Sequence, residues 1–218
     1  MYQEKLNAYF DDPARRQQLV DMISRLVRVR SVREEAQPGM PFGPGPAAAL
    51  EEGLKLAVEL GFATKNYDNY VGAVDFNDQE TQLHILCHLD VVGEGTGWTV
   101  TQPYEPIEVD GMLYGRGTDD DKGPVAAVLL AMQAVRDLGV PLKKNVRLLL
   151  GTDEESGSED IAYYYKKEPY APCTFSPDGE FPVINLEKGS YKPVFTKSWE
   201  AESATPRVKE FHGGFRIN

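Results

Sequence analysis

The sequence predicts an α/β fold in which helices cover a mixed β-sheet. Two observations predict it: short apolar runs typical of strands alternate with longer segments of helical period, and glycine, proline and aspartate separate the two kinds of segment. With 218 residues, the chain is long enough for a packed core. At about 150 residues per domain, it corresponds to between one and two domains.

Apolar residues recur at helical spacing in three long segments and one short one, which are 15–29, 47–60, 123–138 and 158–166. Asp12 and Pro13 precede the first segment as an N-cap and a first-turn proline. Gly61 and Gly139 stand just past the ends of the second and third, where helices commonly stop.

Strand-like runs fill the intervals between these helices. Three of them are spaced as in a meander, and four follow later in the chain: 64–67, 70–76 and 82–88, then 145–150, 173–176, 183–187 and 191–195. A weaker pair, 107–109 and 112–114, brackets Asp110-Gly111, a strong signal for a two-residue hairpin turn.

Composition excludes several classes of function. Asp and Glu outnumber Lys and Arg by 34 to 23, a net charge of −11, which disfavours nucleic acids and anionic membranes as partners. Apolar stretches such as 125–131 fall far short of the roughly 20 residues of a membrane helix, and the polar start does not resemble a signal peptide. Two cysteines, Cys87 and Cys173, are too few for a disulfide framework. We therefore expect a soluble, cytoplasmic protein.

The first candidate site segment is His88-Leu89-Asp90, at the end of an apolar run. In a strand, His88 and Asp90 point to one face and Cys87 to the other, so Cys87 is interpreted as a core residue. His84 and His88 would stand about 13 Å apart, too far to share one ion. A lone histidine is usually structural, but a nearby carboxylate is the usual partner of a metal-bound imidazole.

The second segment holds three consecutive carboxylates, Asp119 to Asp121, at a predicted helix start. Helix capping explains one or two of them. A third adds repulsion that a divalent cation would offset.

The third segment, GTDEESG, follows an apolar strand. Thr152 and Glu155 have the spacing of a capping box, so Glu155 has both a capping and a metal-binding interpretation. Capping does not explain Glu154, which could act as a general base beside a metal ligand.

The fourth segment, SPDGEFP, contains Asp178 within a Pro-Asp-Gly sequence that by itself favours a turn. All four segments follow a predicted strand or begin a predicted helix. In α/β folds such positions meet at one edge of the sheet, so together they predict a single site rich in carboxylates.

The segments HLDVV, GRGTDDDKGP, GTDEESG and SPDGEFP together resemble the signatures of the zinc-dependent metallopeptidase superfamily that includes aminoacylases, glutamate carboxypeptidases and dipeptidases. The last segment and the dense GRG-to-DDKGP block look most like the PepV-type, Xaa-His or carnosinase-like bacterial dipeptidases. This resemblance extends over essentially all of residues 1–218. It implies a three-layer α/β/α sandwich around a mixed, mostly parallel sheet.

Position by position, the resemblance implies that His88 and Asp178 bind one zinc ion and Glu155 a second, with Asp120 bridging the two. Asp119 is left outside the site. The family leads us to expect a cis peptide bond after Asp120.

The resemblance also implies roles in catalysis. Glu154 would be the general base for metal-activated water, and Asp90 would orient His88. The implied activity is hydrolysis of dipeptides, a small peptide substrate. Two alternatives remain: a related amide hydrolase, such as an acylamino-acid or succinyl-diaminopimelate deacylase, and a non-catalytic binding module on the same fold.

The same resemblance implies the domain organisation. Residues 1–189 would form the catalytic metal-binding domain and 190–218 the start of a lid domain. In the family a late histidine completes the second zinc site, and His212 is better interpreted as an exposed loop residue than as its substitute. We therefore expect one zinc ion or none to be bound tightly, and the sequence to be an incomplete fragment with little activity alone.

Overall fold

The computed structural model describes residues 2–179 together with Ile184 and Gly189. Every element belongs to the unit Met1–Phe181. In chain order the elements are α1 (Tyr2–Phe10), α2 (Pro13–Val27), α3 (Pro44–Glu59), β1 (Ala63–Tyr67), β2 (Val71–Asp75), β3 (Thr81–His88), β4 (Ile107–Val109), β5 (Met112–Tyr114), α4 (Lys122–Asp137), β6 (Asn145–Gly151), the 3₁₀ turn η1 (Glu154–Ser156), α5 (Glu159–Tyr164) and β7 (Cys173–Phe175). Among the described helices, none has the length and apolar character needed to cross a membrane.

Five strands form one mixed sheet in the order β1-β2-β6-β3-β7. The pairs β6–β3 and β3–β7 are parallel, and β1–β2 and β2–β6 are antiparallel. Four of the five strands therefore run in one direction, with β2 reversed. The predicted fold class, a mixed and mostly parallel sheet between helices, is confirmed.

The meander predicted for the first three strands is only partly correct. β1 and β2 are antiparallel neighbours, but β6 lies between β2 and β3. The reason is burial: Leu148, Leu149 and Leu150 of β6 are completely buried, with side chains on both faces of the sheet. A strand that is apolar on both faces is most stable at the centre of a sheet.

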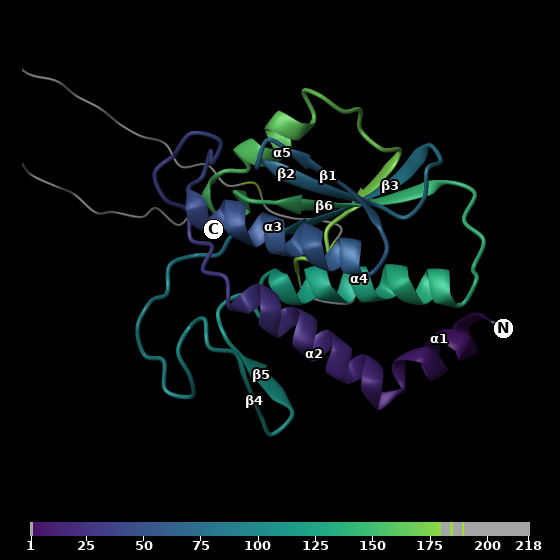
Figure 1. Cartoon of the computed structure of the whole chain (residues 1–218), viewed down its shortest axis with the longest axis horizontal. Helices are drawn as coiled ribbons and strands as arrows, with labels where there is room; N and C mark the ends of the chain where they lie inside the picture. Colours follow the sequence, from purple (N-terminus) through teal and green to yellow (C-terminus); the bar gives the residue numbers. More distant parts are fainter. Residues whose placement is uncertain (1, 180–183, 185–188, 190–218) are drawn as a thin grey trace, which may run out of the picture. The chain divides into compact units, whose positions relative to one another are not determined.

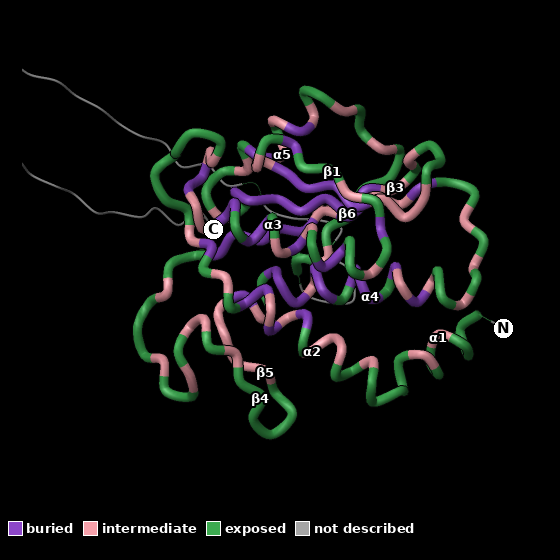
Figure 2. The backbone as a smooth tube through the Cα atoms, in the orientation of Figure 1, coloured by how far each residue is buried: buried purple, intermediate pink, exposed green. Residues whose placement is uncertain are grey.

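Helices cover the two faces of the sheet unequally (Figure 1). On one face α3 packs against β1, β2 and β6, α4 packs against β3, and α2 lies outside them against α4 and α3. The larger core fills this side and includes Cys87, which confirms its interpretation as a core residue. A smaller core with Tyr67, Leu149 and Tyr164 lies on the other face, beneath α5. The central strands β2 and β6, between the two cores, are mostly buried (Figure 2).

The predicted helices form, with small shifts at their ends. Asp12 caps α2 by accepting the N–H of Ala14 at 2.9 Å. α3 begins at Pro44, three residues before the predicted start, because prolines are tolerated in a first turn whose N–H groups have no partner within the helix.

The start of α4 is anchored from inside the protein. Lys122 is completely buried, and its ammonium group donates to the carbonyl of Val29, just past the end of α2, at 2.7 Å. Burial lowers the pKa of Lys122 to about 7. This contact fixes the loop that carries Asp120.

The weaker strand pair forms the separate hairpin β4–β5. Asp110 and Gly111 both have positive φ, 51° and 79°, as the predicted two-residue turn requires. Other expectations lie outside the described residues: the strands at 183–187 and 191–195, the lid segment 190–218, and the position of His212.

We predict that Leu150→Ala lowers the free energy of unfolding by about 2–5 kcal/mol, because it leaves a cavity in the larger core. Urea denaturation followed by circular dichroism measures the change. Val58→Ala on the exposed side of α3 is the control, expected to lie within about 0.5 kcal/mol of wild type. Equal midpoints for the two variants would contradict this packing.

Candidate metal centre

The candidate site lies where the parallel strands end. His88 is the last residue of β3, β6 ends at Gly151 just before Glu154 and Glu155, and Asp178 follows β7 by three residues. Because these three strands run in the same direction, their carboxyl ends meet at one edge of the sheet. The predicted grouping of segments at one edge thus follows from the strand directions.

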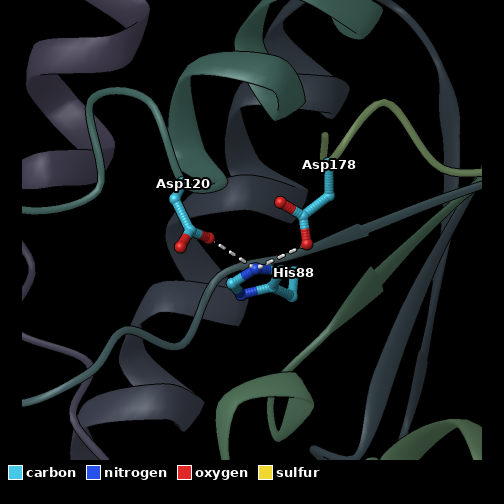
Figure 3. Close-up of side chains that lie close together, drawn as sticks. All are labelled: His88, Asp120 and Asp178. Carbon is cyan, nitrogen blue, oxygen red and sulfur yellow. Dashed lines mark hydrogen bonds and ion pairs between the residues drawn. The ribbon is translucent and has the colours of Figure 1, made fainter. Parts of the chain in front are cut away.

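Three of the predicted ligands converge (Figure 3). His88 Nε2 is 3.0 Å from Asp120 Oδ1 and 3.4 Å from Asp178 Oδ2. One donor atom from each of the three residues lies within 4.8 Å of the others. The imidazole is buried, whereas side chains of Asp120 and Asp178 are 59% and 31% exposed, so the group opens to solvent on its carboxylate side.

Asp90 holds the other side of the imidazole. His88 Nδ1 is 3.0 Å from the Asp90 carbonyl and 3.4 Å from its carboxylate. Burial lowers the pKa of His88, but the hydrogen bond and charge of Asp90, together with the charges of Asp121 and Asp120, raise it to about 10. His84, by contrast, bonds the Tyr165 hydroxyl at 3.0 Å and lies outside the group.

Asp121 fixes the backbone of His88. The peptide bond between Asp120 and Asp121 is cis, as expected from the resemblance. The carboxylate of Asp121 is completely buried, makes no capping hydrogen bond to α4, and accepts the His88 N–H at 2.9 Å. Burial raises the pKa of Asp121 to about 7. Among the described residues, its Oδ1 has no hydrogen-bond partner.

Glu154 and Glu155 lie in η1, where their backbone contacts Asp90. Their N–H groups donate to Asp90 Oδ1 and Oδ2 at 3.2 and 3.1 Å. Neither side chain belongs to the group formed by His88, Asp120 and Asp178. Partial burial raises the pKa of both, helped for Glu154 by the charge of Asp178 and for Glu155 by that of Asp120.

The capping box that Thr152 and Glu155 could form is absent at this described turn. The Thr152 hydroxyl instead contacts the carbonyl of Tyr70 at 2.7 Å, and η1 has no side-chain cap. Asp178 lies in a turn and also faces the candidate site. The Gly179 N–H donates to the Pro177 carbonyl at 3.1 Å, as the Pro-Asp-Gly sequence predicts, and the Asp178 carboxylate faces His88.

Two buried carboxylates near the site were not anticipated from the sequence. Asp153 accepts hydrogen bonds from Arg33 and from the N–H of Glu159. Asp160 accepts the N–H groups of Thr152 and Asp153. Their only sequence signal is an acidic residue at the start of a short turn or helix, which capping explains equally well.

The donor set fits a divalent metal ion. It comprises one imidazole nitrogen and two carboxylates, and His88 is oriented through its second ring nitrogen, as metal-bound histidines usually are. A cation would offset the negative charges gathered here and would replace the proton on Nε2.

Comparison with curated proteins gives relatives named as dipeptidases. The Bacillus subtilis (strain 168) protein named "Putative dipeptidase YtjP" is 37% identical over 94% of this chain. A Staphylococcus aureus (strain USA300) relative, also named as a dipeptidase, is 37% identical over 87% of the chain. These alignments span 45% and 39% of the relatives, so the chain spans less than half of their length.

Solved structures give the same fold. Human carnosine dipeptidase 1 superposes with a TM-score of 0.68 at 25% identity, covering 81% of this chain and 41% of that one. An M20 family metallo-carboxypeptidase from Sulfolobus solfataricus has a TM-score of 0.60 at 22% identity, covering 75% and 37%. Residues 84–195, which contain His88, Asp120, Glu154 and Asp178, match the sequence pattern of one family, and the chain belongs to peptidase family M20/M25/M40.

Proposed function

We propose that the protein is a metallopeptidase that hydrolyses dipeptides, and that this chain supplies a binding site for one zinc ion. The observation that carries the proposal is the convergence of His88, Asp120 and Asp178, with the second ring nitrogen of His88 held by Asp90. Family membership and the dipeptidase names of the relatives support the choice of substrate.

Each proposed role uses a group in the described site. His88, Asp120 and Asp178 hold the ion, and Asp90 orients His88. A bound zinc ion would polarise the scissile carbonyl and make water more acidic. Asp120 and Glu155 are the proposed ligands that this chain offers to a second ion.

We assign the general base to Glu154. Partial burial and the charge of Asp178 raise its pKa above the usual value of a glutamate, which favours a group that must first accept a proton and then return it to the leaving amine. Its backbone is fixed by Asp90, so the carboxylate leaves the turn from a defined point next to the proposed ligands.

We predict that the 218-residue chain binds one zinc ion through His88, Asp120 and Asp178. Asp178→Asn should weaken zinc binding by about 100-fold or more, because loss of even an outer partner of a metal ligand lowers affinity about 10- to 100-fold. Competition with a chromophoric chelator measures the affinity. Asp119→Asn is the matched control, since Asp119 is exposed, carries the same charge and lies outside the group. Equal affinities for the two variants would rule out Asp178 as a ligand.

We predict that Glu154→Gln lowers kcat for dipeptide hydrolysis by about 10²- to 10⁴-fold, because the amide cannot accept a proton. The assay uses the protein expressed from its complete reading frame, with zinc content measured in parallel. Glu159→Gln, an exposed neighbour in the same segment, should retain wild-type turnover. Full activity of Glu154→Gln would exclude Glu154 as the general base. If the wild-type protein hydrolyses N-acyl amino acids and no dipeptides, the proposed substrate class is wrong.

A further inference from the structure

The segment that carries Glu154 and Glu155 is fixed mainly by side-chain carboxylates. We call residues 152–161, which connect β6 to α5, the 152–161 turn. Six of its backbone N–H groups donate to carboxylate oxygens, those of residues 152, 153, 154, 155, 159 and 161. The acceptors are only three residues: Asp90, Asp153 and Asp160.

All three acceptors are buried, with exposures of 1%, 0% and 0%. Burial of a carboxylate is costly unless hydrogen bonds compensate it, and bonds from N–H groups to an ionised carboxylate are among the stronger ones in proteins. The backbone of the turn is therefore held from the inside of the protein, in a conformation that satisfies several N–H groups at once.

Asp160 holds the part of the turn that directly precedes Glu154. Its Oδ2 accepts the N–H groups of Thr152 and Asp153 at 2.6 and 3.0 Å, and its Oδ1 accepts that of Ile161 at 2.7 Å. Burial raises the pKa of Asp160 to about 6, which leaves the carboxyl group mostly ionised at neutral pH.

Gly151 leaves the space that this carboxylate needs. A Cβ atom at position 151 would lie 2.6 Å from Asp160 Oδ2, closer than non-bonded atoms approach. Gly151 at the end of β6 and Asp160 of α5 thus fit together as a pair.

We propose that Asp160 is a positioning residue, whose carboxylate holds the N–H groups of Thr152 and Asp153 and thereby sets the direction in which Glu154 and Glu155 leave the turn. The catalytic role of the two glutamates rests on the proposed function, whereas the effect of Asp160 on the backbone of the turn does not. The conformation of the turn and the catalytic rate are therefore measured separately.

The first measurement is amide hydrogen exchange, residue by residue, in the 218-residue chain. In Asp160→Asn the remaining acceptor is neutral, so exchange at residues 152–155 should accelerate about tenfold, while residues 148–150 of β6 keep their wild-type rates. Glu159→Gln, with the same charge change on the adjacent residue, should leave all these rates unchanged. Unchanged rates at 152–155, or equal acceleration in β6, would overturn the proposal.

Gly151→Ala provides a second variant that displaces the same carboxylate without changing its charge, and it decides the matter if Asp160→Asn does not fold. The added methyl group should accelerate exchange at residues 152–155 in the same local pattern. Wild-type exchange in Gly151→Ala would overturn the proposal.

The second measurement is catalysis by the protein expressed from its complete reading frame. Asp160→Asn should lower kcat about tenfold while KM stays unchanged and the zinc ion proposed for His88, Asp120 and Asp178 stays bound, because the described hydrogen bonds of Asp160 go to the turn and not to those ligands. Loss of all bound zinc, or an unchanged kcat in a variant with accelerated exchange, would overturn the positioning role. If wild type hydrolyses no dipeptide, the proposed function fails, and the exchange rates still decide whether Asp160 holds the turn.

Discussion

The geometry of the candidate site depends on the contacts of one buried carboxylate, that of Asp90. It lies 3.4 Å from the imidazole of His88 and accepts the N–H groups of Glu154 and Glu155. One buried side chain therefore connects the end of β3 to the turn that follows β6. Because Asp90 Oδ1 faces the imidazole and also accepts the Glu154 N–H, the orientation of the imidazole and the position of Glu154 are coupled.

The sheet makes this connection possible. β6 and β3 are adjacent and parallel, so the carboxyl end of one lies beside that of the other, and the buried leucines of β6 keep the pair at the centre of the sheet. The same arrangement concentrates negative charge at one edge, in a chain whose net charge is already −11. Backbone N–H groups and Arg33 stabilise the buried carboxylates, whereas those of Asp120 and Asp178 are partly exposed to solvent beside His88.

Local patterns predicted four of the five described α-helices and the described strands, and they indicated that the four acidic segments meet at one edge, because periodicity and strand ends are properties of neighbouring residues. The helix α1 (Tyr2–Phe10) was not predicted. The position of β6 between β2 and β3 was not predicted, since it depends on which strand is apolar on both faces. The Thr152 hydroxyl likewise bonds a carbonyl at residue 70, a contact between distant segments that no local spacing reveals. Asp160 was missed because an acceptor of backbone N–H groups has no sequence pattern of its own.

The three proposed ligands are not anchored equally. His88 ends β3, which has neighbours on both sides, and Asp120 precedes the long helix α4. Asp178 follows β7, which pairs with β3 over only three residues and is the last strand of the described sheet. Short outer strands open more readily than central ones. The lifetime of an ion at the proposed site should therefore be set by how often β7 separates from β3, so that a short edge strand would control the rate of metal exchange.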